Sequence, residues 1–164
     1  HAKKYGYKSV TVCEKPNVIR ETSGMMYKMA QEIQKTDFSE IELVMSYVLD
    51  NDDYRSLRKF KGKEKIDFLD NYWSEIDPDK GTSENELLNE LKTRVLESKE
   101  LFSGIDGGLL SDRAKIYIIY GPPNDEYKTS SYNNNNIEIL IWKYKTGYEF
   151  NFIIDSFGRY KIIN

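Results

Sequence analysis

Histidine and cysteine are almost missing from this 164-residue sequence, and their scarcity excludes several kinds of chemistry. The sole histidine is His1, so neither a Ser-His-Asp triad nor a His-rich transition-metal site is expected. The single cysteine, Cys13, can form neither an internal disulfide nor a thiolate metal cluster. We expect it to be a small buried side chain, because no histidine is available to activate the thiol. The sequence therefore predicts no metal site and no cofactor.

An excess of one charge and a long apolar run are missing as well. The chain has 24 Lys and Arg residues against 27 Asp and Glu residues, a net charge of −3. Nucleic acid is disfavoured as the main partner, because phosphate binding needs a basic surface. No stretch is long and apolar enough to span a bilayer, and the first ten residues contain no apolar signal core. Because the chain opens on His1 rather than methionine, we expect it to be a fragment of a longer protein.

The residues that are present favour one compact domain over residues 1–164. Apolar residues make up 39% of the chain, and 13 tyrosines, 7 phenylalanines and 2 tryptophans supply large surfaces to bury in a core. We expect residues 1–20 to be an extended lead-in that contains a strand over 5–14. Residues 21–102 form the predicted helical part, and residues 103–164 form the predicted β part.

Apolar residues at helical spacing predict the helical part. The predicted helices cover residues 21–35, 39–60, 66–73 and 84–102. Ser39 is expected to cap the second helix, and the third must stop before Pro78. Ser83, with Glu86 three residues later, has the spacing of a capping box for the last helix.

The period changes to two after Gly104, Gly107 and Gly108, which break the last helix. The predicted strands cover residues 114–120, 137–144, 148–155 and 159–163. The first is nearly all apolar, which is typical of a strand covered on both faces, and Gly121-Pro122-Pro123 ends it. Residues 124–136 are polar and include Asn133–Asn136, so they are expected to form an exposed loop.

Four consecutive strands with short returns predict an antiparallel meander. Phe150, Phe152 and Ile154 alternate along one strand and are expected to face the core. The expected fold class is α+β, with N-terminal helices packed on a C-terminal four-stranded antiparallel meander.

One segment resembles the signature of a known family. Residues 107–123 read GGLLSDRAKIYIIYGPP, which is similar to the Gly-Trp-x-Thr-Asp-Arg-Gly motif, Tyr-Ile run and Gly-Pro-Pro stop of the GWxTD family. The resemblance extends to FLDNYW at 68–73, IWKY at 141–144 and FNF at 150–152, and thus covers most of the chain from about Asp37. Leu109 stands in place of the namesake tryptophan, Ala114 in place of the second glycine and Ser111 in place of threonine. Leu109 can still fill an apolar pocket.

This resemblance implies a bacterial protein with an extracytoplasmic location, in the periplasm or associated with the outer membrane. Family members often carry a β-sandwich ahead of this domain. Residues 1–20 would then be the end of such a preceding domain.

The Ser111-Asp112-Arg113 step has two interpretations. In the structural one, the hydroxyl and the carboxylate satisfy backbone N–H groups near the glycine-rich turn, and Arg113 donates to a carboxylate or to carbonyls. In the functional one, Asp112 is a general acid or an anchor, and Arg113 clamps an anion beside Pro122 and Pro123. The candidate binding residues are thus these five, and no catalytic residue is assigned.

Two further acidic features of the sequence are candidates for a ligand site. Asp77, Asp79 and Gly81 resemble part of a calcium loop, but the glycine is one position early and the twelfth position is Leu88 rather than glutamate. A turn that enters the next helix explains them better. A carboxylate pair for glycoside hydrolysis stays open, because sequence gives no distances between acids.

We therefore expect a non-catalytic structural or protein-interaction module of a bacterial envelope protein, with a protein as its partner. Such a module predicts an exposed apolar or aromatic patch near the signature loop. The alternative is a glycan-binding or peptide-binding domain, or a hydrolase that uses carboxylates near Ser111-Asp112-Arg113.

Overall fold

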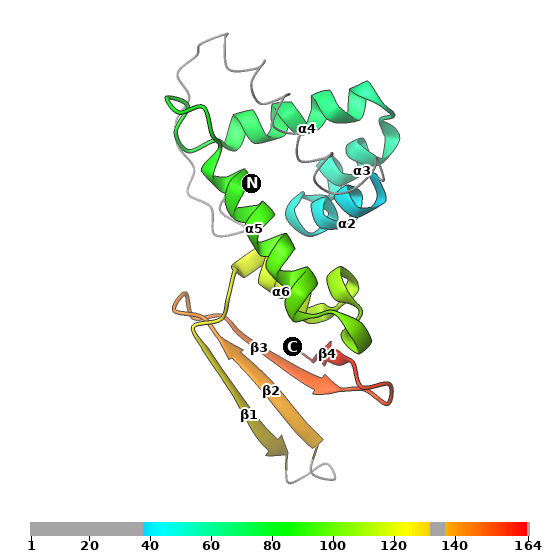
Figure 1. Ribbon diagram of the computed structural model, residues 1–164, viewed down its shortest axis with the longest axis vertical. Helices are drawn as coiled ribbons and strands as arrows, with labels where there is room; N and C mark the ends of the chain where they lie inside the picture. The colour runs from blue at the N-terminus through cyan, green and yellow to red at the C-terminus, as the bar shows by residue number, and fades with distance from the viewer. Residues whose placement is uncertain (1–37, 132–136, 164) are drawn as a thin grey trace. The chain divides into compact units, whose positions relative to one another are not determined.

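The computed structural model describes residues 38–131 and 137–163, and Figure 1 labels their helices and strands. The predicted strand over 5–14, the predicted helix over 21–35, the burial of Cys13 and the Asn133–Asn136 run lie outside these residues. The chain divides into two compact units, residues 1–92 and 93–164, with the boundary inside one helix. That residues 1–164 form one domain stays a prediction.

Helices make up the described part of the first unit. They are α2 (Phe38–Val48), α3 (Asn51–Lys59), α4 (Lys63–Ile76) and the first part of α5 (Glu86–Leu101). Each contributes to the buried apolar side chains, which include Val44, Met45, Val48, Leu57, Leu69, Trp73, Leu88 and Leu91. The helical part thus follows the apolar spacing of the sequence.

The predicted helix over 39–60 is two helices, because Asp50 begins a new one. Its carboxylate accepts hydrogen bonds from the backbone N–H groups of Asp52 (3.0 Å) and Asp53 (2.8 Å). An aspartate in this geometry is a favourable N-cap. The prediction that Ser39 caps a helix was wrong as well, since α2 already begins at Phe38.

A buried asparagine, rather than the predicted capping box at Ser83, begins α5. Asn85 is 1% exposed; its Oδ1 accepts from the N–H of Leu88 (2.9 Å), and its Nδ2 donates to the carbonyl of Trp73 (2.7 Å). One amide therefore satisfies both the start of α5 and the backbone of α4. The Asp77–Gly81 segment is the expected entry turn, in which Asp79 accepts from the N–H of Gly81 (2.9 Å).

The second unit carries the sheet, which Figure 1 colours from yellow to red. After α5 come the short 3-10 helices η2 (Gly104–Asp106) and η3 (Gly108–Leu110) and the helix α6 (Asp112–Tyr120). The strands are β1 (Asp125–Ser131), β2 (Ile137–Lys143), β3 (Glu149–Ile154) and β4 (Tyr160–Ile162). They pair antiparallel in the order β1-β2-β3-β4, so β1 and β4 are the two edges. The α+β class and the four-stranded antiparallel sheet are confirmed.

The first strand of the prediction was wrong, because residues 114–120 lie in α6. A short apolar run is compatible with either a buried strand or a buried helix. Its flanks are typical of a helix, with Ser111 as N-cap and Gly121 ending it through an N–H bonded to the carbonyl of Tyr117 (2.7 Å). The strand that completes the sheet is β1, which lies inside the predicted loop over 124–136, and the side chains of residues 125–130 are exposed.

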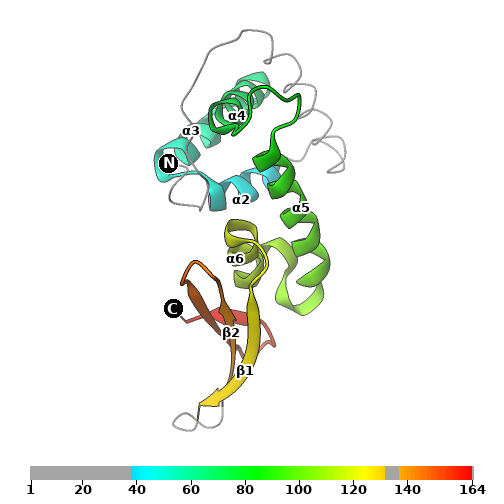
Figure 2. The ribbon, with the colours of Figure 1, turned by 90° about the vertical axis from the view of Figure 1, so that its left-hand side faces the viewer.

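The core of the second unit lies between α6, the end of α5 and one face of the sheet. Trp142 and Phe152 meet at a ring-centroid distance of 5.1 Å, and Phe102 meets Tyr117 at 5.7 Å. Phe152 is fully buried, as predicted. Phe150 is half-buried, and Ile154, at the end of β3, is 41% exposed instead of facing the core. Figure 2 shows β1 and β2 beneath α6.

The C-terminal end of α6 is fixed by Arg94 and Tyr144. Arg94 Nη1 donates to the carbonyls of Ile118 (3.2 Å) and Ile119 (3.0 Å), and the Tyr144 hydroxyl donates to the carbonyl of Gly121 (2.9 Å). Gly121 has a φ of +80°, and a Cβ there would lie 3.2 Å from the Arg94 guanidinium. Glycine is therefore required here both for its backbone and for the space that it leaves.

We expect Gly121→Ala to lower the free energy of unfolding by about 2–3 kcal/mol, because it combines a strained φ with pressure on the guanidinium. Gly147→Ala is the matched control, since Gly147 has a φ of +90° but nothing within 4 Å of its added Cβ. The control should lose only about 1–2 kcal/mol. Urea unfolding of both variants checks the difference; equal losses would show that Arg94 yields without cost.

A pH effect follows from Tyr117, whose hydroxyl donates to Glu97 (2.7 Å). Burial and then this bond raise the pKa of Tyr117 from 10.0 to about 12. Because the folded pKa is raised, the stabilisation is fully present below pH 10 and is lost as the pH rises through about 12.

Tyr117→Phe should therefore show a shallower loss of stability between pH 10 and 12, by roughly 2 kcal/mol relative to the wild type. The measurement is urea unfolding across that range. Tyrosinate absorbance should show one fewer late-titrating phenol. Parallel pH profiles of the two proteins would contradict the prediction.

Candidate functional site

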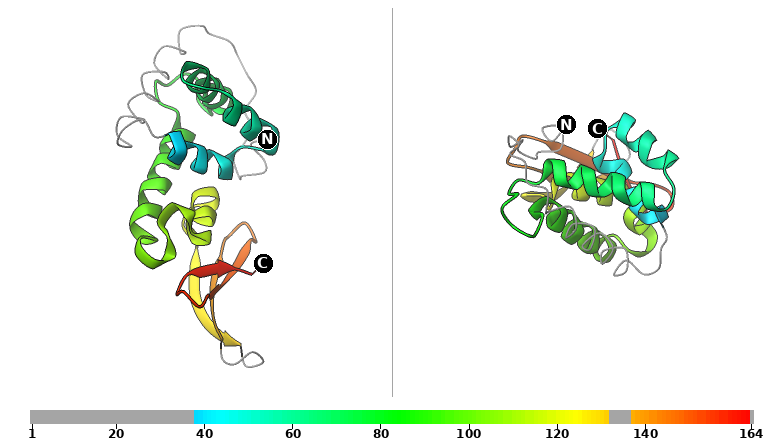
Figure 3. Two further views of the ribbon diagram at one scale, coloured as in Figure 1. Left: turned by 90° about the vertical axis from the view of Figure 1, so that its right-hand side faces the viewer. Right: turned by 90° about the horizontal axis from the view of Figure 1, so that it is seen from above.

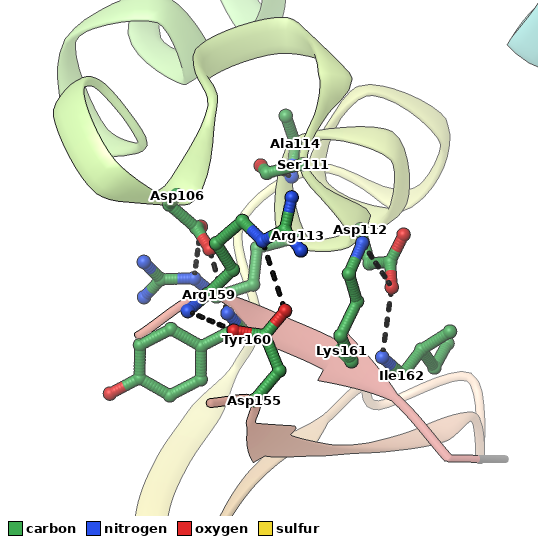
Figure 4. Close-up of polar contacts among 10 residues, drawn as sticks. All are labelled: Asp106, Ser111, Asp112, Arg113, Ala114, Asp155, Arg159, Tyr160, Lys161 and Ile162. Atoms are coloured by element: carbon green, nitrogen blue, oxygen red, sulfur yellow. Dashed lines mark hydrogen bonds and ion pairs between the residues drawn. The ribbon is translucent and has the colours of Figure 1, made fainter. Parts of the chain in front are cut away.

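The signature loop, residues 106–113, lies against the edge strand β4, and Figure 4 shows their polar contacts. Ser111 is 3% exposed, and its Oγ accepts a hydrogen bond from the N–H of Ala114 (3.0 Å). It thus satisfies one free donor in the first turn of α6. The predicted role of this hydroxyl in bonding a backbone N–H is confirmed.

Two carboxylates satisfy the outer edge of β4. Where β4 pairs with β3, the carbonyl of Arg159 and the N–H of Ile163 point toward β3. Because the backbone groups of successive residues alternate in direction, the N–H groups of Tyr160 and Ile162 point away from the sheet. Asp106 Oδ1 accepts from the N–H of Tyr160 (2.8 Å), and Asp112 Oδ2 accepts from that of Ile162 (3.1 Å). The loop carboxylates therefore occupy the place of a further strand.

Asp112 also lies 3.7 Å from the ammonium of Lys161, measured to its Oδ2. Both side chains are partly exposed, at 29% for Asp112 and 42% for Lys161, so this pair contributes little. The bond to the strand backbone is the more directional of the two contacts.

Arg113 joins the loop to β4 through charge and aromatic contact. Its Nε donates to Asp106 Oδ2 (2.8 Å), with the two side chains 18% and 6% exposed. The guanidinium lies 3.9 Å from the ring centroid of Tyr160 and 4.9 Å from that of Phe102. Cation–π contact of this kind is stronger when it is shielded from water. Figure 4 shows Asp106 bonded to both Arg113 and Tyr160.

The turn before β4 is ordered by another acid. Asp155 Oδ1 accepts from the N–H groups of Phe157 (2.8 Å) and Arg159 (2.9 Å), and Oδ2 accepts from Arg159 Nε (2.9 Å). These bonds, with the one from the Arg159 backbone foremost, lower the pKa of Asp155. The turn therefore delivers β4 to the loop in a defined position.

The structure does not bring all five candidate residues together. Ser111, Asp112 and Arg113 lie at the start of the nine-residue helix α6, whereas Pro122 and Pro123 follow its end. At a rise of about 1.5 Å per residue, these two groups are about 12 Å apart. The functional interpretation required Arg113 to lie beside the prolines, and it does not. Whether any of the five binds a ligand stays a prediction.

Sequence reasoning missed Asp106, Phe102 and Tyr160, the partners of Arg113. Its position immediately before the Gly107-Gly108 pair is the one signal that the sequence offered for Asp106, which the structure buries to 8% exposure. Leu109, in the place of the namesake tryptophan, is also 8% exposed and fills an apolar position as expected. Tyr160 is too distant in sequence to be paired with the loop by spacing.

Apolar side chains are exposed on the signature loop, on the residue just before it and on the turn that precedes β4. Ile105 and Leu110 are each 71% exposed, and Phe157 is 73% exposed. Ile105 Cγ2 would lie 3.3 Å from a Cβ at Gly158, so the residue just before the loop lies close to the turn that carries Phe157. We call Ile105, Leu110 and Phe157 the apolar patch.

Among residues 38–131 and 137–163, no three His, Cys, Asp or Glu side chains are grouped so that they could hold a metal ion. In the same part of the chain, no helix combines the length and apolarity needed to cross a membrane.

Comparison with known proteins finds a family but no individual relative. The family model described as GWxTD domain matches residues 13–161. No curated protein and no solved structure matches the chain.

We expect Asp106→Ala to lower the free energy of unfolding by about 3 kcal/mol, because it leaves Arg113 and the Tyr160 N–H without their acceptor. Glu149→Ala is the control: it removes one partner of the Lys143–Glu149 pair, whose side chains are 45% and 43% exposed. The control should lose less than about 1 kcal/mol. Urea unfolding measures both, and a small loss for Asp106→Ala would show that the loop is not secured by this carboxylate.

Proposed function

The chain belongs to the GWxTD domain family, and we propose that it serves as a non-catalytic structural or protein-interaction module of a bacterial envelope protein. The proposal depends on what the signature side chains bond to. The polar side chains of the signature loop bond to other parts of the protein, whereas the apolar patch is exposed.

The main support for this proposal is that the polar side chains of the signature form hydrogen bonds with other groups of the same protein. Both oxygens of Asp106 have partners, one in Arg113 and one in the Tyr160 backbone. Ser111 is bonded to the backbone of α6, and Asp112 to that of β4. A general acid or nucleophile needs an oxygen that can reach a substrate. These contacts support a loop whose chemistry stabilises the fold.

The apolar patch supports a protein as the partner. Large apolar side chains that are this exposed are typical of interaction sites, because burying them against a partner removes them from water. Ile105 and Phe157 are held by short structured segments, so little conformational entropy is lost when a partner covers them.

An extracytoplasmic location is part of the proposal. It is supported by the resemblance of this chain to a family whose members are typically exported. The alternative, a glycan- or peptide-directed binder or hydrolase, would use Asp112, which is the more exposed of the two loop carboxylates.

Photo-crosslinking in bacterial cells that express the full-length protein tests the proposal. A photoreactive residue at Leu110 or at Phe157 should give the same discrete protein adduct. The matched control is Lys145, which is exposed on the β2–β3 turn and should give none.

Leu110→Glu should reduce the adduct from position 157 by at least ~10-fold without changing the melting temperature, because Leu110 is already 71% exposed. An unchanged adduct would refute the patch as the contact. Turnover of a glycan or peptide that is lost in Asp112→Asn, with stability unchanged, would favour the enzymatic alternative instead.

A further inference from the structure

The two edge strands of the sheet differ in length and in the contacts that their outward backbone groups make. Edge β4 has three residues, and the loop carboxylates cover its outward N–H groups. Edge β1 has seven residues, Asp125–Ser131. The left view of Figure 3 is seen from the β4 side of the sheet, and Figure 2 from the β1 side. A long uncovered edge invites pairing with another strand.

The antiparallel pattern identifies which β1 groups point outward. The N–H of Tyr144 bonds to the carbonyl of Tyr148, so the even-numbered residues of β2 bond to β3 and its odd-numbered residues bond to β1. The register pairs odd-numbered residues of β1 with odd-numbered residues of β2, so the backbone groups of the odd-numbered β1 residues bond to β2. The N–H and C=O groups of Glu126, Lys128 and Ser130 therefore point away from the sheet. In the part of the chain that the structure describes, no hydrogen bond is seen on these outward groups.

The side chains of β1 favour a second copy of the same strand as the occupant. Two antiparallel copies related by a two-fold axis must match outward residues with outward residues. A register centred on Tyr127 places Glu126 of each copy opposite Lys128 of the other, which gives two cross-strand pairs of opposite charge. A register centred on Lys128 instead opposes two lysines. Charge thus selects the first register.

Three further features fit that register. Tyr127 is 41% exposed, and it would meet its own copy across the axis in a non-hydrogen-bonded pair, where side chains approach most closely. Glu126 is already oriented by a bond from the Trp142 indole (2.7 Å), and Lys128 by Glu138 (2.8 Å). Both bonds run to β2, so pairing in this register gives each charge a second partner.

We propose that two copies of this chain associate through antiparallel pairing of their β1 strands, centred on Tyr127, to form a continuous eight-stranded sheet from the two four-stranded sheets. The contact lies at the opposite edge of the sheet from the signature loop. It is independent of whether the loop is structural or catalytic.

Sedimentation of the full chain over a range of concentrations tests the association. The wild type should dimerise. Lys128→Pro removes an outward N–H that the sheet itself does not use, and proline is tolerated at such edge positions. This variant should dimerise at least ~10-fold more weakly, while its circular dichroism and melting temperature stay close to those of the wild type.

A charge variant provides the matched test. Lys128→Glu combined with Glu138→Lys keeps the ion pair between β1 and β2 with its signs exchanged, yet opposes Glu126 to a glutamate of the other copy. It should also weaken the dimer. A wild-type chain that stays monomeric, or a dimer that neither variant weakens, overturns the proposal and leaves the edge to a strand of another protein.

Cysteine crosslinking tests the register, in a background in which Cys13 is serine. Tyr127→Cys places two sulfurs across the axis, at a spacing that suits a disulfide, and should give a covalent dimer under mild oxidation. Thr129→Cys is the control, because its two copies would lie roughly 13 Å apart along the strands. Equal crosslinking by both variants would refute this register.

Discussion

Two backbone N–H groups on a three-residue edge strand constrain the whole β part of this chain. Neither group has a neighbouring strand to bond to, and a polar group left without a partner at a half-buried edge costs free energy. Asp106 and Asp112 supply the acceptors from a loop about fifty residues earlier. Because β4 is so short, these two bonds and the Arg113–Tyr160 contact add to its pairing with β3. The signature residues are therefore best understood by what they do for the strand.

Burying Asp106 creates a second requirement, which Arg113 meets. A carboxylate that is 6% exposed is costly unless it is paired and hydrogen-bonded. The guanidinium supplies the opposite charge, and the rings of Phe102 and Tyr160 shield it from water on two sides. Gly107, with a φ of +97°, allows the chain to turn so that Asp106 and α6 both approach β4. The Asp106–Arg113 ion pair, the aromatic rings that cover it and the backbone conformation of Gly107 thus depend on one another.

The sequence predicted those features that local pattern determines. Three of the four strands, the breaks at Gly104 and Gly107 and most of the helical part follow from apolar period and turn residues. The error at residues 114–120 arose because a run that is buried on several sides has no clear period, and β1 was missed because an exposed edge strand has few apolar residues.

Within the candidate site, the roles of Ser111 and Arg113 followed from their donors and acceptors. Their partners did not. Asp106 and Tyr160 are 54 residues apart, and only the register of the sheet brings them together.

That separation has a consequence for how the chain acquires its structure. During synthesis, Asp106 and Arg113 emerge from the ribosome about fifty residues before Tyr160, so the loop cannot reach this partner until β4 has also been made. Contacts between such distant residues form late, because a long intervening segment must first be ordered. Without β4, the loop would keep its acids and its guanidinium but lose the strand that they hold.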